Sequence, residues 1–99
     1  MKKVVIKGKE YKIGYSLRVL FMYEKKNGKP FSGDTLESMY MLMYASLLAL
    51  NDDFVMSFEE LIDVCDEDMS IYDSFQQIVI EASKRMESYN ENKKKVMEN

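Results

Sequence analysis

The chain has 99 residues, enough for one modest core, and it carries 14 basic and 17 acidic side chains for a net charge of −3. It has no histidine, which removes the usual general base at neutral pH and the commonest ligand of transition metals. Its only cysteine, Cys65, cannot form a disulfide within the chain, so the fold must rest on packing and we expect a reducing compartment.

The N-terminal residues predict a β-hairpin. Two short stretches of alternating apolar and polar side chains flank Gly8-Lys9, a two-residue link with Gly where a type II′ turn needs a positive φ. Closing the hairpin there pairs Lys7 with Glu10. The apolar side chains that then share one face are Val4, Ile6, Tyr11 and Ile13. Because a two-stranded ribbon is marginal alone, it must pack on helices or pair with strands of another copy.

A short helix is predicted over residues 17–26. Ser16 is placed to cap its start, and Asn27-Gly28 can close it in the left-handed conformation before Pro30. Its apolar face is expected to consist of Leu17, Leu20 and Phe21, widened by Val19, Met22 and Tyr23.

Residues 35–50 predict a central helix, with Asp34 as its cap. Helical spacing gives this segment a first apolar stripe of Leu36, Met39, Tyr40, Met43, Leu47 and Leu50. A second stripe consists of Glu37, Met41, Tyr44 and Leu48. A helix that is apolar on two faces needs neighbours on two sides. The segment is shorter than the ~20 apolar residues of a membrane span, so we expect it to be the buried centre of the domain.

Two more helices are predicted after the central one. Ser57 and Glu60 form a capping-box pattern before an apolar stripe of Phe58, Leu61, Ile62 and Cys65. The last helix begins at Asp68 or Ser70. Its apolar seam at three-four spacing, broken only by Lys93, is Tyr72, Phe75, Val79, Ala82, Met86, Tyr89 and Val96. We therefore expect an α+β, mostly helical fold: an N-terminal β-hairpin packed on about four helices, the central one buried. Residues 1–83 are the expected globular domain, and residues 84–99 a polar helical C-terminal extension.

No pattern in the sequence predicts catalysis or a bound cofactor. The acidic residues Asp63, Asp66, Glu67 and Asp68 lack the glycine and the ligand spacing of a calcium loop. There is no glycine-rich phosphate loop, no Cys-x-x-Cys pair, and no Ser, Cys or Thr with a candidate base. We expect a protein that is not an enzyme and that needs neither a cofactor nor a metal.

Charge is divided sharply along the chain. Residues 1–30 carry nine basic and two acidic side chains (+7), residues 31–83 carry twelve acidic and no basic ones (−12), and residues 84–99 carry five basic and three acidic ones (+2). The basic segment can cover acidic helices within one monomer, or the basic face of one copy can meet the acidic face of the next in a ring or filament. Nucleic-acid binding is disfavoured because the acidic remainder would repel phosphate.

The stretch Leu-Arg-Val-Leu-Phe-Met-Tyr-Glu-Lys-Lys-Asn-Gly-Lys-Pro-Phe, residues 17–31, resembles the signature of small tail assembly chaperones of long-tailed bacteriophages and prophages. Those proteins often show a short strand pair and then a helix of the form Leu-x-x-Phe-Glu-x-x-x-Gly-Lys-Pro-Phe. Here Tyr23-Glu24 stands at the aromatic–acid step and Gly28-Lys29-Pro30-Phe31 at the close. The similarity runs from Val4 to Asp68 and does not cover the last helix.

The resemblance implies a non-enzymatic protein of the bacterial host cytoplasm that forms homo-oligomers and coats the hydrophobic tape measure protein before the tail tube polymerises. Neither a nucleic acid nor a membrane is an expected partner. The side chains expected to bind the partner are Met41, Tyr44 and Leu48 of the second stripe and Met86 and Tyr89 of the extension. Asp at Met41 or Leu48 should then abolish partner binding in a chain that still folds. The alternative is a small adaptor or regulatory module that docks one protein partner in a one-to-one complex.

Overall fold

In the computed structural model the backbone is described for residues 1–98 and the side chains for residues 1–85. The elements in chain order are β1 (Lys2–Ile6), β2 (Lys9–Ile13), α1 (Leu17–Asn27), α2 (Leu36–Leu50), α3 (Phe58–Glu67) and α4 (Ser70–Glu98). One antiparallel hairpin and four helices confirm the α+β, mostly helical fold expected from the sequence.

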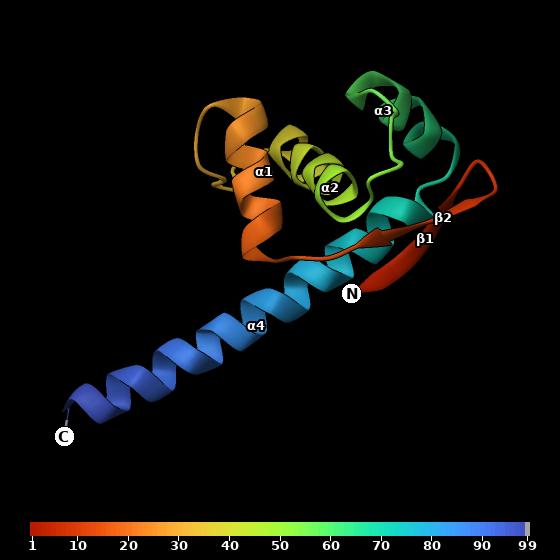
Figure 1. The fold of residues 1–99 in the computed structure, drawn as a ribbon. Helices are drawn as coiled ribbons and strands as arrows, with labels where there is room; N and C mark the ends of the chain where they lie inside the picture. The colour runs from red at the N-terminus through yellow and green to blue at the C-terminus, as the bar shows by residue number, and fades with distance from the viewer. Residues whose placement is uncertain (99) are drawn as a thin grey trace.

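Helix α2 is the centre of the packing. It contacts α1, α3, α4 and β2, while β1 lies against the start of α4 (Figure 1). The buried side chains of α2 are Leu42, Met43, Ala45, Ser46 and Leu47. The expectation of a buried central helix is confirmed, but the buried face differs from the expected stripe: Met43 and Leu47 are buried, whereas Met39, Tyr40 and Leu50 are half-buried. Leu36, placed by its spacing on the same stripe, is 67% exposed.

The hairpin has a different register from the expected one. Val5 pairs with Glu10 and Ile6 with Lys9, so the turn is Lys7-Gly8 instead of Gly8-Lys9. Lys7 (φ 51°) and Gly8 (φ 79°) are both in the left-handed region, as a type I′ turn requires at both central positions. The slip equals two residues and therefore leaves the core face unchanged, with Val4, Ile6 and Ile13 buried as expected.

The turn gives a prediction for stability. Lys7 adopts a positive φ that Asn tolerates much better, so Lys7→Asn should raise the free energy of unfolding by about 0.5 kcal/mol. Lys7→Gln removes the same charge without this backbone preference and should give no gain. Urea unfolding of both variants measures the difference, and an equal stability for the two would contradict the assigned turn.

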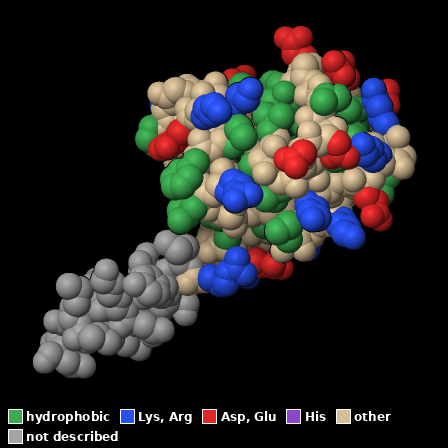
Figure 2. All heavy atoms as spheres, in the orientation of Figure 1, with side chains coloured by type: hydrophobic (Ala, Val, Ile, Leu, Met, Phe, Trp, Pro, Cys, Tyr) green, Lys and Arg blue, Asp and Glu red, His purple; other side chains and the backbone are tan. Residues whose placement is uncertain are grey.

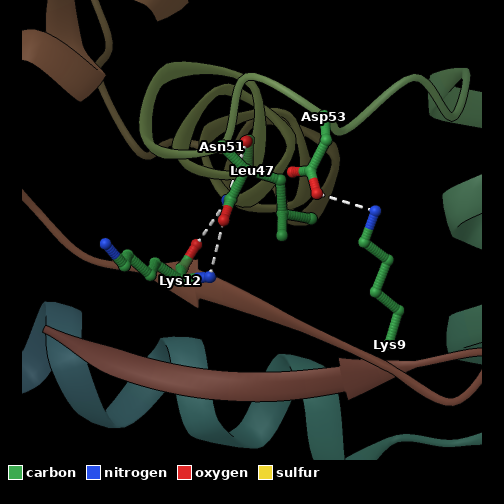
Figure 3. A network of polar contacts seen from close by, with 5 residues as sticks. All are labelled: Lys9, Lys12, Leu47, Asn51 and Asp53. Atoms are coloured by element: carbon green, nitrogen blue, oxygen red, sulfur yellow. Dashed lines mark hydrogen bonds and ion pairs between the residues drawn. The ribbon is translucent and has the colours of Figure 1, made fainter.

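The outer edge of β2 is closed by two polar side chains of α2. Gly14 N–H donates to Ser46 Oγ (2.8 Å), and Ser46 Oγ–H donates to the Gly14 carbonyl (2.9 Å). Two residues earlier, Lys12 N–H donates to Asn51 Oδ1, and Asn51 Nδ2 donates to the Lys12 carbonyl, both at 2.8 Å (Figure 3). Ser46 and Asn51 thus each form hydrogen bonds with both the backbone N–H and the backbone C=O of one residue, as a neighbouring β-strand would. The hairpin is therefore fastened to α2 along this edge.

Helix α1 begins and ends where the sequence indicates, but it buries a different face. Ser16 caps its start and Gly28 (φ 74°) ends it in the left-handed conformation. Val19 is fully buried, and Tyr23 is buried with its ring packed edge-on against Phe31 at 5.2 Å. The expected face is wrong at Leu17 and Phe21, whereas Leu20 is half-buried against the core. Leu17 and Phe21 are 68% and 61% exposed, and Figure 2 shows hydrophobic side chains at the surface over α1.

The caps of the later helices also refine the sequence boundaries. Thr35, one residue after the expected Asp34, caps α2 through a hydrogen bond from Ser38 N–H to Thr35 Oγ1 (3.1 Å). Ser57 caps α3 as expected and accepts from Glu60 N–H at 3.2 Å. At the start of α4, the Asp68 carboxylate accepts from both the backbone N–H and the hydroxyl of Ser70.

Helix α4 continues as one element from Ser70 to Glu98 and extends away from the body, giving a longest dimension of 53 Å (Figure 1). Its buried side chains are Ile71, Tyr72, Phe75, Ile78 and Ala82. The expected boundary between domain and extension at Ser83 stays a prediction. None of the helices in the part of the chain that the structure describes combines the length and apolar character needed to cross a membrane.

Candidate partner-binding site

An apolar groove lies between the first half of α2 and the outer side of α3, and ends at the junction of α3 with α4. We call it the α2–α3 groove. Its apolar lining consists of Leu36, Tyr40, Phe58, Ile62, Cys65 and Met69, and its acidic rim of Glu37 and Asp66. Its volume of about 590 Å³ lies within the ~300–1,000 Å³ typical of ligand-binding clefts.

Helical spacing on two elements builds this groove. Leu36 and Tyr40 are four residues apart on α2, while Phe58, Ile62 and Cys65 follow a four-three spacing on α3. Cys65 is buried at the floor, whereas Leu36 and Met69 are 67% and 53% exposed at the margins. The groove therefore presents apolar side chains that no described part of this chain covers.

Tyr40, which lines the groove, stacks on Tyr72 of α4. The rings of Tyr40 and Tyr72 lie 4.2 Å apart with an interplanar angle of 8°. Burial raises the pKa of the Tyr40 phenol, and the nearby carboxylates of Asp66 and Asp73 raise it further. The stack joins α2 to α4 and keeps Tyr40 uncharged well into the alkaline range.

Cys65 is a buried apolar side chain, as its spacing predicts. Only 2% of it is exposed, and burial raises the pKa of its thiol from 9.0 to about 11, with the carboxylates of Asp66 and Asp68 adding to the effect. A thiol that keeps its proton at neutral pH is a poor nucleophile. Cys65 therefore contributes packing to the groove floor.

The raised pKa of Cys65 predicts a loss of stability in alkali. Above pH 9 the thiol of the unfolded chain loses its proton, while the thiol of the native chain keeps it. The contribution of the protonated Cys65 thiol to the free energy of unfolding is therefore complete below pH 9 and is lost as the pH approaches 11. We expect a loss of about 2 kcal/mol over this window from urea unfolding. Cys65→Ala should show a shallower decline, because only the other groups with raised pKa values, the tyrosines and Lys9, still contribute to it. Identical pH profiles for the two chains would contradict the assignment.

The rim of the groove is acidic and has no neutralising cation among the described residues. Within residues 1–85 the ion pairs are Lys9–Asp53 at 2.7 Å (Figure 3) and Lys3–Glu10 at 3.9 Å. The first joins the basic N-terminal segment to the acidic segment inside one chain, and its hydrogen bond lowers the pKa of Asp53. Neither pair involves the rim, so the groove favours an occupant that carries positive charge.

The structure brings Met41, Tyr44 and Leu48 together on α2, but outside the α2–α3 groove. All three are half-buried against the core. The Tyr44 hydroxyl donates to the Met56 carbonyl at 2.8 Å, and its ring packs edge-on against Phe54 and Phe58. Tyr44 is therefore engaged in internal packing.

Partner binding by this stripe stays a prediction. Leu48 lines a shallow pocket of about 330 Å³ between the ends of α1 and α2. The two remaining expected binding residues, Met86 and Tyr89, lie outside the residues whose side chains are described.

Sequence spacing alone did not single out Leu36, Phe58, Ile62 and Met69 as a binding surface. It shows that a helix has an apolar face without showing whether another element covers that face. One signal was available: residues 31–83 carry twelve acidic and no basic side chains, which favours an acidic border for an exposed apolar surface in that segment.

Among the described residues, no three His, Cys, Asp or Glu side chains come close enough together to hold a metal ion. Comparison with models of protein families, with curated proteins and with solved structures gives no match. The similarity to tail assembly chaperones therefore rests on the motif residues between Val4 and Asp68 alone.

Proposed function

We propose that this protein is a non-enzymatic tail assembly chaperone of a bacteriophage or prophage. It forms homo-oligomers and binds apolar helical segments of the tape measure protein in the host cytoplasm during tail morphogenesis. The observation that carries the proposal is the α2–α3 groove, an uncovered apolar cleft with an acidic rim. The motif of residues 17–31 supports the class of protein.

The groove would act by covering apolar partner surface reversibly. An amphipathic helix can place side chains at three-four spacing between α2 and α3, since both walls present side chains at helical spacing. Burying one Leu- or Ile-sized side chain contributes about 1.5–3 kcal/mol, so two or three give moderate and reversible affinity. Glu37 and Asp66 at the rim favour partner segments flanked by Lys or Arg.

The test uses two variants matched in position and exposure. Leu36 is the first residue of α2 and 67% exposed, and Leu17 is the first residue of α1 and 68% exposed. Asp at either position suits a helix N-terminus, so both variants should fold. In tagged pull-downs from nuclease-treated source lysate, wild type and Leu17→Asp should recover a very long tail protein. Leu36→Asp should recover at least tenfold less.

Two results would overturn the proposal. Equal recovery of the long tail protein by both variants would remove the groove from the binding site. Recovery of one small globular partner would favour the adaptor function instead. The adaptor is the second candidate because a single cleft of about 590 Å³ suits one docked helix in a one-to-one complex.

A further inference from the structure

The α2–α3 groove and the C-terminal extension lie at opposite ends of α4. Met69, just before α4, lines the groove, and Tyr72 in the first turn stacks on Tyr40. At ~1.5 Å per residue, the 15 residues from Met69 to Lys84 span about 22 Å of helix. Figure 1 shows α4 leaving the body in one direction. The extension therefore cannot reach the groove of its own chain while α4 stays intact.

The sequence of the extension continues the buried stripe of α4. Ala82 is buried, and apolar residues recur at the same three-four spacing at Met86 and Tyr89, and again at Val96 after Lys93 has taken the position between. At ~100° per residue, Lys93 falls within this seam, where an apolar residue would be due, and Arg85 falls at its edge, while Lys84, Lys94 and Lys95 fall away from it. The acidic residues of the extension fall on the opposite side: Glu87, Glu91 and Glu98.

The two surfaces are complementary in character. The groove offers an apolar floor with Glu37 and Asp66 at its rim, and residues 31–83 supply no cation of their own. The extension offers an apolar seam accompanied by Arg85 and Lys93. Opposite charges beside matching apolar surfaces set the orientation of a contact and disfavour wrong partners.

We propose that the extension of one copy, residues 84–98, docks in the α2–α3 groove of a second copy. Met86 and Tyr89 enter the groove while basic side chains approach the acidic rim. Because each copy has one groove and one extension on different surfaces, the contact is heterologous and adds copies head to tail in a chain or ring. The inference rests on the proposed function in one respect: the docked extension occupies the groove until a tape measure segment displaces it.

The test mixes two full-length variants that are each defective on one side. Leu36→Asp impairs the groove and keeps the extension, while the double variant Met86→Asp/Tyr89→Asp impairs the extension and keeps the groove. Size-exclusion chromatography with light scattering should show wild type and Leu17→Asp growing in mass with concentration. Each defective variant alone should stay monomeric. An equimolar mixture should give a complex of two chains that grows no further.

Several outcomes would overturn the docking. The first is a wild type that stays monomeric at every concentration. The second is a Leu36→Asp variant that assembles as wild type does, and the third is a mixture that stays monomeric. A pull-down by the double variant separates the two proposals. If tape measure binding fails but docking holds, the mixture still pairs and no long tail protein is recovered. If docking fails but the chaperone function holds, the long tail protein is recovered, and neither the groove variant nor the extension variant differs from wild type in its assembly.

Discussion

Phe75→Ala is expected to lower the free energy of unfolding by about 3–5 kcal/mol. Phe75 is the largest side chain that is fully buried, with none of its surface exposed. It lies on the part of α4 that packs against β1, α2 and α3. Truncation removes the transfer free energy of the ring and leaves a cavity that three separate elements must close. Domains of this size are stable by ~5–15 kcal/mol, so a large share of the total would be lost.

Equilibrium urea unfolding measures this effect, with Gln76→Ala as the control. Gln76 is the next residue on the same helix and is exposed, so its truncation should change stability by less than about 0.5 kcal/mol. A Phe75→Ala loss as small as that of the control would mean that α4 does not depend on this contact.

Ser46→Ala should cost about 2–3 kcal/mol, far more than a surface serine. Its hydroxyl bonds both the N–H and the carbonyl of Gly14, and both residues are buried. Removing the hydroxyl leaves two backbone groups without partners and away from water, and each carries a desolvation cost. The loss in the free energy of unfolding exceeds that for an ordinary hydrogen bond, because no other group replaces the two bonds of the Ser46 hydroxyl.

Two companion variants make the comparison informative. Ser83→Ala changes an exposed serine of α4 and should be neutral or slightly stabilising, since Ala is the better helix former. Asn51→Ala removes hydrogen bonds to Lys12 that lie at the surface, where water can take their place, so it should cost less than Ser46→Ala. If Asn51→Ala is the more damaging change, burial is not what gives the Ser46 contact its strength.

The hairpin shows which part of a strand prediction is robust. Gly8 satisfies a positive φ both as the first residue of a type II′ turn and as the second of a type I′ turn, so composition left two registers open. They differ by two residues, and side chains alternate with a period of two. The buried face was therefore predicted correctly from the sequence, while the turn and the strand pairs were not.

Helix α1 shows the opposite case. Its ends follow from Ser16 and Gly28, because capping is local chemistry. Its apolar residues cover a wide arc, and only the direction from which α2 approaches decides that Val19 and Tyr23 are buried instead of Leu17 and Phe21. Sequence spacing cannot supply that direction.

The α2–α3 groove lay beyond sequence reasoning for a related reason. Both stripes that line it were recognisable, at Leu36 and Tyr40 on one helix and at Phe58 and Ile62 on another. A groove is the space left between two such stripes, and it depends on how far apart the helices are held. In this fold the floor between the two stripes is the buried Cys65 of α3, and Tyr40 of α2 stacks on Tyr72 of α4.

The same stack gives the molecule an optical property. The chain contains no tryptophan, so its seven tyrosines dominate its near-ultraviolet absorption and its intrinsic fluorescence. Two rings nearly parallel at 4.2 Å couple their electronic transitions, and the coupling depends on their relative orientation. Because Tyr40 also lines the groove, a side chain pressed against it changes the near-ultraviolet circular dichroism of the pair. The protein therefore carries a built-in spectroscopic reporter of groove occupancy that needs no label.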